Sequence, residues 1–210
     1  MSFEPSPTVP KQTAFIVDDD PSIREALCDL IESAGLATQS FHSAETFLDA
    51  WTPDMAGCLV LDVRLPGIGG IELQGILAEA GLSIPIIIMT AHGDVPMVRK
   101  AMKAGAVEFL TKPFQDDELL QAIEQAFARD VALRTAKTIE NSILARLWTL
   151  SPRERKVMEL VTTGMTNKEI ADALDLRLVT VKLYRGAMME KMQADSLADL
   201  VKMSERIKTL

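Results

Sequence analysis

Five residues with ionisable or hydroxyl side chains stand at the ends of short apolar runs of the sequence. They are Asp18, Asp19, Asp62, Thr90 and Lys112. If the apolar runs are neighbouring parallel strands, these side chains converge at the carboxyl edge of the sheet, where such folds bind ligands. Two carboxylates about 4 Å apart repel by about 4 kcal/mol at an effective dielectric near 20. The cluster therefore requires a bound cation, a shared proton or the lysine nearby.

The ligand atoms that this cluster offers to a cation are oxygens, and no thiolate lies among them. Such a set favours Mg²⁺, or Mn²⁺, over zinc or copper. A magnesium ion beside an exposed aspartate suits phosphoryl transfer to that carboxylate, because the metal neutralises the charge that builds up on the phosphoryl oxygens. The lysine would neutralise this charge from the other side.

Short apolar runs alternate with helical patterns over the first two thirds of the chain. We expect buried strands at 14–17, 59–61, 84–89 and 107–110, and helices at 23–34, 43–51, 71–80, 95–104 and 116–129. Asp20, followed by Pro21, is expected to cap the first helix rather than to bind metal. This alternation implies right-handed crossovers and a parallel sheet with helices on both faces. The predicted fold class is therefore α/β, a doubly wound parallel sheet.

Four segments carry a resemblance to a known family: 17–19 (Val-Asp-Asp), 61–67 (Leu-Asp-Val-Arg-Leu-Pro-Gly), 89–91 (Met-Thr-Ala) and 111–114 (Thr-Lys-Pro-Phe). In this order and spacing, residues 12–130 resemble the receiver domain of two-component response regulators. The resemblance implies a flavodoxin-like fold with five parallel strands. It also implies that Asp62 is a phosphoacceptor, which receives its phosphoryl group from a phosphohistidine of a sensor histidine kinase.

The same resemblance implies a magnesium site. Asp19, Asp62 and the backbone carbonyl of Arg64 would bind Mg²⁺ directly, and Asp18 would bind it through water. An alternative with similar chemistry is an aspartyl-phosphate hydrolase, which needs a second carboxylate two residues after the nucleophile as a general acid. Position 64 is an arginine, so that proton donor is missing. We therefore expect a protein that is not an enzyme and that undergoes at most slow autodephosphorylation.

The resemblance further implies a conformational switch beside the phosphoacceptor. Lys112 would contact the phosphoryl group, and Thr90 would swing toward it on activation. Phe109, three residues before the lysine, takes the position of the aromatic switch residue of the family. The peptide bond between Lys112 and Pro113 would be cis, which costs little only before proline.

The last sixty residues predict a small helical domain. Ser151-Pro152-Arg153-Glu154 and Thr166-Asn167-Lys168-Glu169 are capping boxes that start two helices. A third helix is expected from Leu178 to about Met192, and Ser196 is expected to cap a fourth. Two helices joined by a turn of a few residues form a helix-turn-helix, whose second helix enters the major groove of DNA.

The motifs of this domain resemble the four-helix DNA-binding domain of NarL/FixJ-type, LuxR-like regulators over about residues 149–203. Val181, Met188 and Met192 are expected to face the core. In the helix-turn-helix, the candidate contacts to phosphates and bases are Lys168, Thr180, Lys182, Leu183 and Arg185. This chain departs from the family at Tyr184, which replaces a histidine, at Gly186, and at Arg177, which replaces a small capping residue. Arg177 cannot accept an amide hydrogen bond, so the start of this helix should be less stable by about 1 kcal/mol.

The charge of the chain changes where the predicted domains change. The net charge is −8, but residues 1–148 hold 11 Lys and Arg against 21 Asp and Glu, whereas residues 149–210 hold 11 against 9. Such an asymmetry indicates two modules with different partners. We expect an N-terminal tail at 1–11, a receiver domain at 12–130, a helical linker at 131–148 and a DNA-binding domain at 149–210.

No apolar run approaches the roughly 20 residues that span a bilayer, and the two cysteines, Cys28 and Cys58, lack metal-ligand spacing. We therefore expect a cytoplasmic protein without membrane contact. The combined reading is a transcriptional regulator that phosphorylation of Asp62 activates by promoting dimerisation and promoter binding. Its expected partners are a sensor histidine kinase, double-stranded promoter DNA, a second copy of the chain and RNA polymerase. Two alternatives remain at this point: a regulator independent of phosphorylation, and a signalling adaptor whose terminal helices bind protein.

Overall fold

The computed structural model describes residues 11–91, 93 and 95–208. The predicted N-terminal tail lies outside the described residues, apart from Lys11. The chain divides into two compact units, residues 1–133 and 134–210, and each is described by itself.

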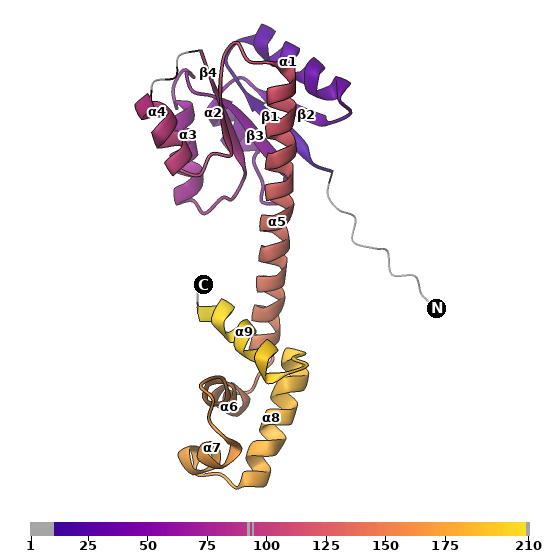
Figure 1. Cartoon of the computed structure of the whole chain (residues 1–210), viewed down its shortest axis with the longest axis vertical. Helices are drawn as coiled ribbons and strands as arrows, with labels where there is room; N and C mark the ends of the chain where they lie inside the picture. Colours follow the sequence, from indigo (N-terminus) through magenta and orange to yellow (C-terminus); the bar gives the residue numbers. More distant parts are fainter. Residues whose placement is uncertain (1–10, 92, 94, 209–210) are drawn as a thin grey trace, which may run out of the picture. The chain divides into compact units, whose positions relative to one another are not determined.

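The first unit is built on a sheet of five parallel strands in the order β2-β1-β3-β4-β5. This order and the helices between the strands confirm the predicted doubly wound α/β fold (Figure 1). The strands are β1 (Thr13–Val17), β2 (Ala37–Phe41), β3 (Gly57–Asp62), β4 (Ile86–Thr90) and β5 (Glu108–Thr111). The three inner strands are almost entirely buried, because helices cover both faces of the sheet.

Helices pack on the two faces of this sheet in two separate apolar layers (Figure 1). One layer lies under α1 (Pro21–Ser33) and α5 (Asp116–Trp148). The other lies under α2 (Ala44–Ala50), α3 (Gly70–Glu79) and α4 (Val95–Lys103). Helix α5 is 33 residues long: it contains the helix predicted at 116–129 and continues without a break through the predicted helical linker to Trp148.

The start of α1 shows how the sequence sets a local boundary. The side chain of Asp20 accepts a hydrogen bond from the backbone N–H of Ser22 at 2.8 Å, and Pro21 occupies the first turn. Asp20 is thus the N-cap of the helix, as predicted, and its carboxylate is engaged in that role. The chain therefore turns into α1 directly after the two aspartates that end β1.

The second unit contains the helices α6 (Pro152–Thr162), α7 (Asn167–Leu174), α8 (Leu178–Met192) and α9 (Leu197–Lys208), together with the last part of α5. Both predicted capping boxes are present: Ser151 pairs with Glu154, and Thr166 with Glu169. Val181, Met188 and Met192 are fully buried, as expected, in one apolar core. A short turn joins α7 to α8, which gives the predicted helix-turn-helix.

Candidate functional site

The pairing of the strands brings the predicted cluster of the first unit together. Val17 lies opposite Leu61 in the register of β1 and β3, so the residues that follow each strand meet at the same edge. Thr90 lies opposite Thr111 at the end of β4 and β5. The structure therefore places Asp18, Asp62, Thr90 and Lys112 at one edge of the sheet.

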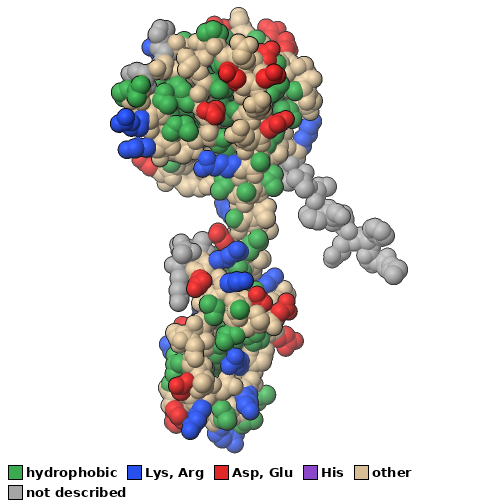
Figure 2. Space-filling model, in the orientation of Figure 1, with side chains coloured by type: hydrophobic (Ala, Val, Ile, Leu, Met, Phe, Trp, Pro, Cys, Tyr) green, Lys and Arg blue, Asp and Glu red, His purple; other side chains and the backbone are tan. Residues whose placement is uncertain are grey.

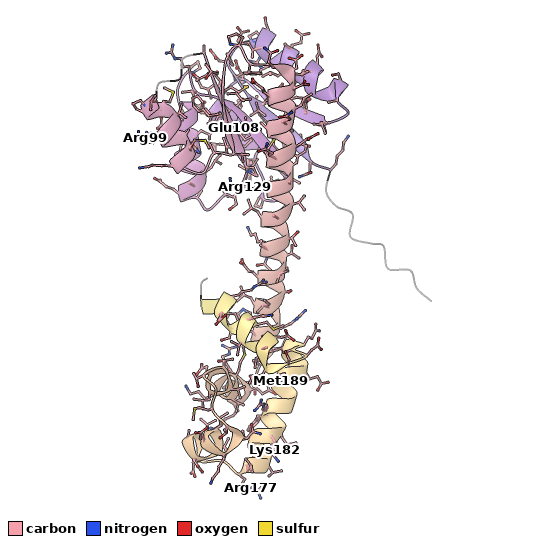
Figure 3. The ribbon with its side chains drawn as sticks, viewed as in Figure 1. Arg99, Glu108, Arg129, Arg177, Lys182 and Met189 are labelled. Carbon is pink, nitrogen blue, oxygen red and sulfur yellow. The ribbon has the colours of Figure 1, made fainter. Side chains whose placement is uncertain are left out.

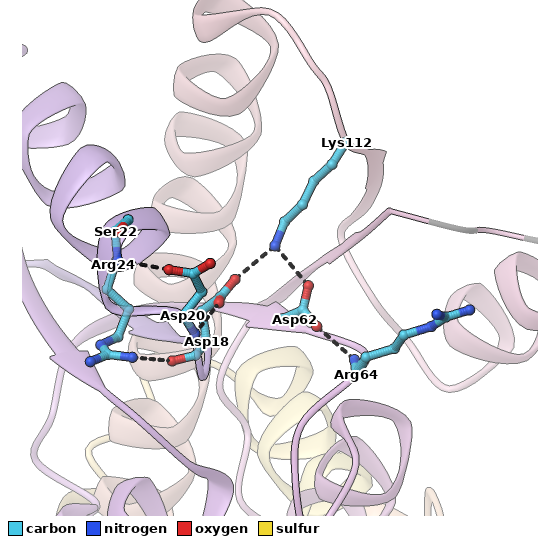
Figure 4. Close-up of polar contacts among 7 residues, drawn as sticks. All are labelled: Asp18, Asp20, Ser22, Arg24, Asp62, Arg64 and Lys112. Atoms are coloured by element: carbon cyan, nitrogen blue, oxygen red, sulfur yellow. Dashed lines mark hydrogen bonds and ion pairs between the residues drawn. The ribbon is translucent and has the colours of Figure 1, made fainter.

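Lys112 connects the two buried carboxylates of this edge (Figure 4). Its Nζ lies 2.7 Å from Oδ2 of Asp18 and 2.8 Å from Oδ1 of Asp62. Asp18 and Asp62 are 1% and 7% exposed. Burial lowers the pKa of Lys112. The hydrogen bonds to Asp18 and Asp62 raise it by more than burial lowers it, so the pKa lies above its ordinary value. The lysine is therefore a cation shared by two carboxylates.

The backbone around Asp62 fixes the direction of its carboxylate. The N–H of Arg64 donates a hydrogen bond to Oδ2 of Asp62 at 2.6 Å, while the side chain of Arg64 points away from the cluster (Figure 4). Helix α3 begins close to the end of β3, because Gly70 has no side chain: a Cβ at this position would lie 2.2 Å from the carbonyl oxygen of Asp62. The N–H of Arg64 and the ammonium group of Lys112 thus each hold one oxygen of the Asp62 carboxylate.

The donors at this edge fit a hard divalent cation in chemistry and in charge. Asp18 and Asp62 offer oxygen atoms, and the single positive charge of Lys112 leaves their pair with a net negative charge. Asp19 is exposed beside them and adds a further negative charge. Within residues 11–91, 93 and 95–208, however, no three acidic, histidine or cysteine side chains form a group that could hold a metal ion. The structure thus brings two of the three predicted carboxylates together, and Asp19 stays outside this pair.

The two predicted switch residues lie next to the cluster. Thr90 is fully buried at the end of β4, and its carbonyl oxygen accepts a hydrogen bond from the backbone N–H of Lys112 at 2.7 Å. Phe109 in β5 is half-buried. A Cβ at Gly93 would lie 2.8 Å from Cε1 of Phe109 and 3.4 Å from Cγ2 of Thr90. Gly93 is therefore a neighbour of both switch residues, and nothing in the local sequence pattern indicates it.

The second candidate site is the first half of α8 in the second unit. Arg177 and Lys182 lie at the same end of this helix, whereas Met189 lies farther along it (Figure 3). Lys168, Lys182 and Leu183 are exposed, and Thr180 is half-buried. Arg177 is the N-cap of α8 and makes no hydrogen bond with its side chain there, as the sequence predicted. The helix-turn-helix therefore carries exposed cations at Lys168, Arg177 and Lys182.

Arg185 differs from the other candidate contacts. Its Nη1 donates a hydrogen bond to Oδ1 of Asn167 at 2.8 Å, and the side chain is half-buried. Asn167 is the first residue of α7, so this hydrogen bond links the two helices of the helix-turn-helix. The spacing along the sequence did not indicate it, because the two residues come from separate helices.

Comparison with known proteins agrees with the two predicted domains. Residues 14–124 match the family model of the response regulator receiver domain, and residues 148–204 match that of the bacterial regulatory proteins of the luxR family. Nodulation protein W of Bradyrhizobium diazoefficiens is 50% identical over 197 residues, which cover 94% of this chain and 87% of that protein. The transcriptional regulatory protein FixJ of the same organism is 44% identical over 192 residues, covering 91% and 94%. The chain is a two-component response regulator of the FixJ type.

Solved structures support this assignment at the level of the whole chain. The response regulator StyR has a TM-score of 0.82 at 46% identity, covering 93% of this chain and 99% of that one. Full-length FixJ from B. japonicum has a TM-score of 0.56 at 44% identity, covering 95% and 98%. This response regulator is thus a phosphorylation-activated, DNA-binding regulator of transcription and not a classical enzyme. None of the helices in the described part of the chain is both long and apolar enough to span a membrane.

Proposed function

We propose that Asp62 is the phosphoacceptor of this response regulator and that a sensor histidine kinase is its donor. The observation that supports this most directly is the position of Asp62 at the end of β3, 7% exposed and hydrogen-bonded to Lys112. A carboxylate oxygen of Asp62 attacks the phosphorus atom of a phosphohistidine, and the bond from phosphorus to the imidazole nitrogen breaks. The leaving imidazole takes up a proton.

The residues around Asp62 divide the work of this transfer. Lys112 neutralises negative charge on the phosphoryl oxygens, and its raised pKa keeps it protonated in this role. A Mg²⁺ or Mn²⁺ ion held by Asp19, Asp62 and the carbonyl of Arg64, and through water by Asp18, would supply further neutralisation. Arg64 offers no general base to an attacking water molecule, so autodephosphorylation is at most slow.

Phosphorylation then acts on the protein through Thr90 and Phe109. Thr90 lies beside Asp62 and Lys112, and Phe109 lies in β5, the strand that pairs with β4 and ends one residue before Lys112, so a movement of one is transmitted to the other. Phe109 also lines a groove of about 510 Å³ with residues of α5, among them Glu118 and Gln121. We expect the face formed by α4, β5 and α5 to become the dimer interface of the phosphorylated protein.

In the dimer, two copies of α8 would enter successive major grooves about one helical turn apart. Lys168, Thr180 and Lys182 are assigned to phosphates or base edges, with Leu183 and Arg185 beside them. Because residues 149–210 carry a net charge of only +2, one copy binds DNA weakly, and dimerisation increases the affinity. RNA polymerase is the partner that we expect at the promoter.

Phosphoryl labelling tests the site directly. The full chain is incubated with Mg²⁺ and a small phosphodonor such as acetyl phosphate, and the phosphorylated fraction is measured by intact mass. Wild type should gain one phosphoryl group, whereas Asp62→Asn should gain none, and Asp116→Asn, at the first residue of α5, should behave as wild type. Labelling of Asp62→Asn at the wild-type rate would show that another residue is the acceptor.

A further inference from the structure

Three large apolar side chains are exposed on the first half of α8: Leu178, which is 45% exposed, and the pair Val179 and Leu183. Val179 is 56% exposed and Leu183 is 70% exposed. They are four residues apart in the helix, so they lie on the same face. Neither belongs to the apolar core of the second unit or packs against it. The fold of the unit therefore gives no reason for apolar residues at these positions.

Gly186 extends this face by three residues. It is exposed, and a Cβ at this position would meet no atom within 4 Å. Glycine inside a helix is less favourable than alanine, and no close approach among the described residues requires it here. At Gly186 this face of α8 thus carries no side chain, which allows another molecule to come close to the helix backbone there.

Cations border this apolar face. Lys182 lies next to Leu183 in the sequence, and Arg177 caps the same end of the helix (Figure 3). Lys and Arg side chains gather beside hydrophobic ones at the lower end of the second unit (Figure 2). Arg185, in contrast, is engaged with Asn167 in α7. The face therefore combines an apolar centre with positive charge at its border, which fits a polyanion that has apolar groups in a groove.

We propose that Val179 and Leu183 recognise thymine methyl groups in the major groove. This inference rests on the proposed entry of α8 into that groove. Each base pair presents polar atoms there, and the C5 methyl of thymine is the apolar group among them. An exposed leucine placed against polar base edges would leave their donors and acceptors without partners, whereas a methyl group loses nothing by the contact. The face thus selects duplexes with thymine at the positions that it covers.

Replacing thymine by uracil, which differs from it by this methyl group alone, tests the proposal. Binding sites are selected from a random duplex pool with the full-length protein and acetyl phosphate. Each thymine of a selected site is then replaced singly by uracil, and the dissociation constant is measured by fluorescence anisotropy. We expect at least one replacement per half-site to weaken binding about fourfold, which corresponds to about 0.8 kcal/mol for one buried methyl group.

Variants show which side chain contacts the methyl group. Leu183→Ala or Val179→Ala should lose the sensitivity to uracil at one position and keep it elsewhere. Leu197→Ala in α9, whose side chain is 39% exposed, is the matched control and should respond to uracil as wild type does. Circular dichroism melting of each variant shows that the fold is retained.

Two results overturn the inference, and both differ from a failure of the proposed function. The inference is wrong if uracil has no effect at any position of a tightly bound duplex. It is also wrong if both alanine variants keep the full response of wild type. If the protein binds no duplex at any salt concentration, the placement of α8 in DNA fails instead.

Discussion

The ammonium group of Lys112 donates a hydrogen bond to Oδ1 of Asp62 at 2.8 Å. The same group lies 2.7 Å from Oδ2 of Asp18, so one positive charge compensates two buried carboxylates. Removing one partner of a buried ion pair leaves an uncompensated charge and typically costs 3–5 kcal/mol. We expect Lys112→Met to lower the free energy of unfolding of the first unit by about 3 kcal/mol at pH 7, measured by urea denaturation.

Magnesium should restore much of this loss, because the cation takes over the compensation of the two carboxylates. The stabilisation by millimolar Mg²⁺ should therefore be larger in Lys112→Met than in wild type. Lys103→Met, at the exposed end of α4, is the control and should change neither quantity. Equal stabilisation of Lys112→Met and wild type by Mg²⁺ would argue against a cation site at this edge.

The location of this cluster could be predicted from sequence because it depends on strand ends. Buried parallel strands are continuous apolar runs, and their carboxyl ends meet at one edge whatever the loops do. The detailed contacts could not be predicted in the same way. Side-chain orientations decide which carboxylates Lys112 contacts, and they leave Asp19 outside the pair. Gly93 lies in the loop after β4 and comes close to Phe109 in β5, and no sequence pattern links these two positions.

Two elements show where periodicity fails. The pattern of apolar residues did not predict the strand at Ala37–Phe41. This strand, β2, lies at the edge of the sheet, has only one buried residue and lacks an apolar run. The pattern also separated a helix at 116–129 from a helical linker at 131–148, whereas α5 runs through both segments to Trp148. Beyond Arg129 the helix carries polar residues around much of its circumference, so its apolar repeat is weak. Helix α8, which has buried residues and a defined end, was predicted with its observed limits.

Gly93 offers a test of the packing around the switch residues. A Cβ at this position would lie 2.8 Å and 3.0 Å from Cε1 and Cζ of Phe109, so Gly93→Ala forces the ring to move. Such overpacking typically costs 1–3 kcal/mol. We expect Gly93→Ala to destabilise the first unit by about 1 kcal/mol. Phe109→Leu should remove most of this cost in the double variant, because the shorter side chain leaves room for the methyl group. Additive effects of the two substitutions in urea denaturation would show that the ring is not the group displaced.

Glu154 makes the stability of the second unit depend on pH. The hydrogen bond from Lys191 and then that from the backbone N–H of Ser151 hold the pKa of Glu154 below its ordinary value of 4.5. A carboxyl group with a lowered pKa in the folded state stabilises the fold above its unfolded pKa, and this contribution is lost as the pH falls through the folded pKa. Glu154→Gln should therefore destabilise α6 and α8 by about 1 kcal/mol at pH 7.

The difference between Glu154→Gln and wild type should shrink as the pH falls below 4.5 and through the lowered pKa of the folded state, where the wild-type carboxyl becomes protonated. Amide hydrogen exchange in α6 and α8 measures the stability of the variant and of wild type within the full chain. Glu159→Gln is the matched control, because its ion pair with Lys156 is 55% exposed on both sides and exposed pairs contribute little. A difference that is constant from pH 7 to pH 3 would contradict the assigned role of the charge.

Substitutions of Arg177, at the start of α8, distinguish the effect of the N-cap on stability from the effect of the positive charge on DNA binding. It occupies the N-cap position without a side-chain hydrogen bond, where a serine would accept one from the backbone. Arg177→Ser should stabilise the second unit by about 1 kcal/mol. It should also weaken DNA binding and reduce the slope of log K against log salt by about 0.9, because one phosphate contact is lost. Arg177→Ala removes the same charge without adding a cap, so it should reproduce the change in binding and leave stability unchanged. If Arg177→Ser gains stability but keeps the wild-type salt slope, Arg177 makes no contact with the phosphates, and its presence at the N-cap needs another explanation.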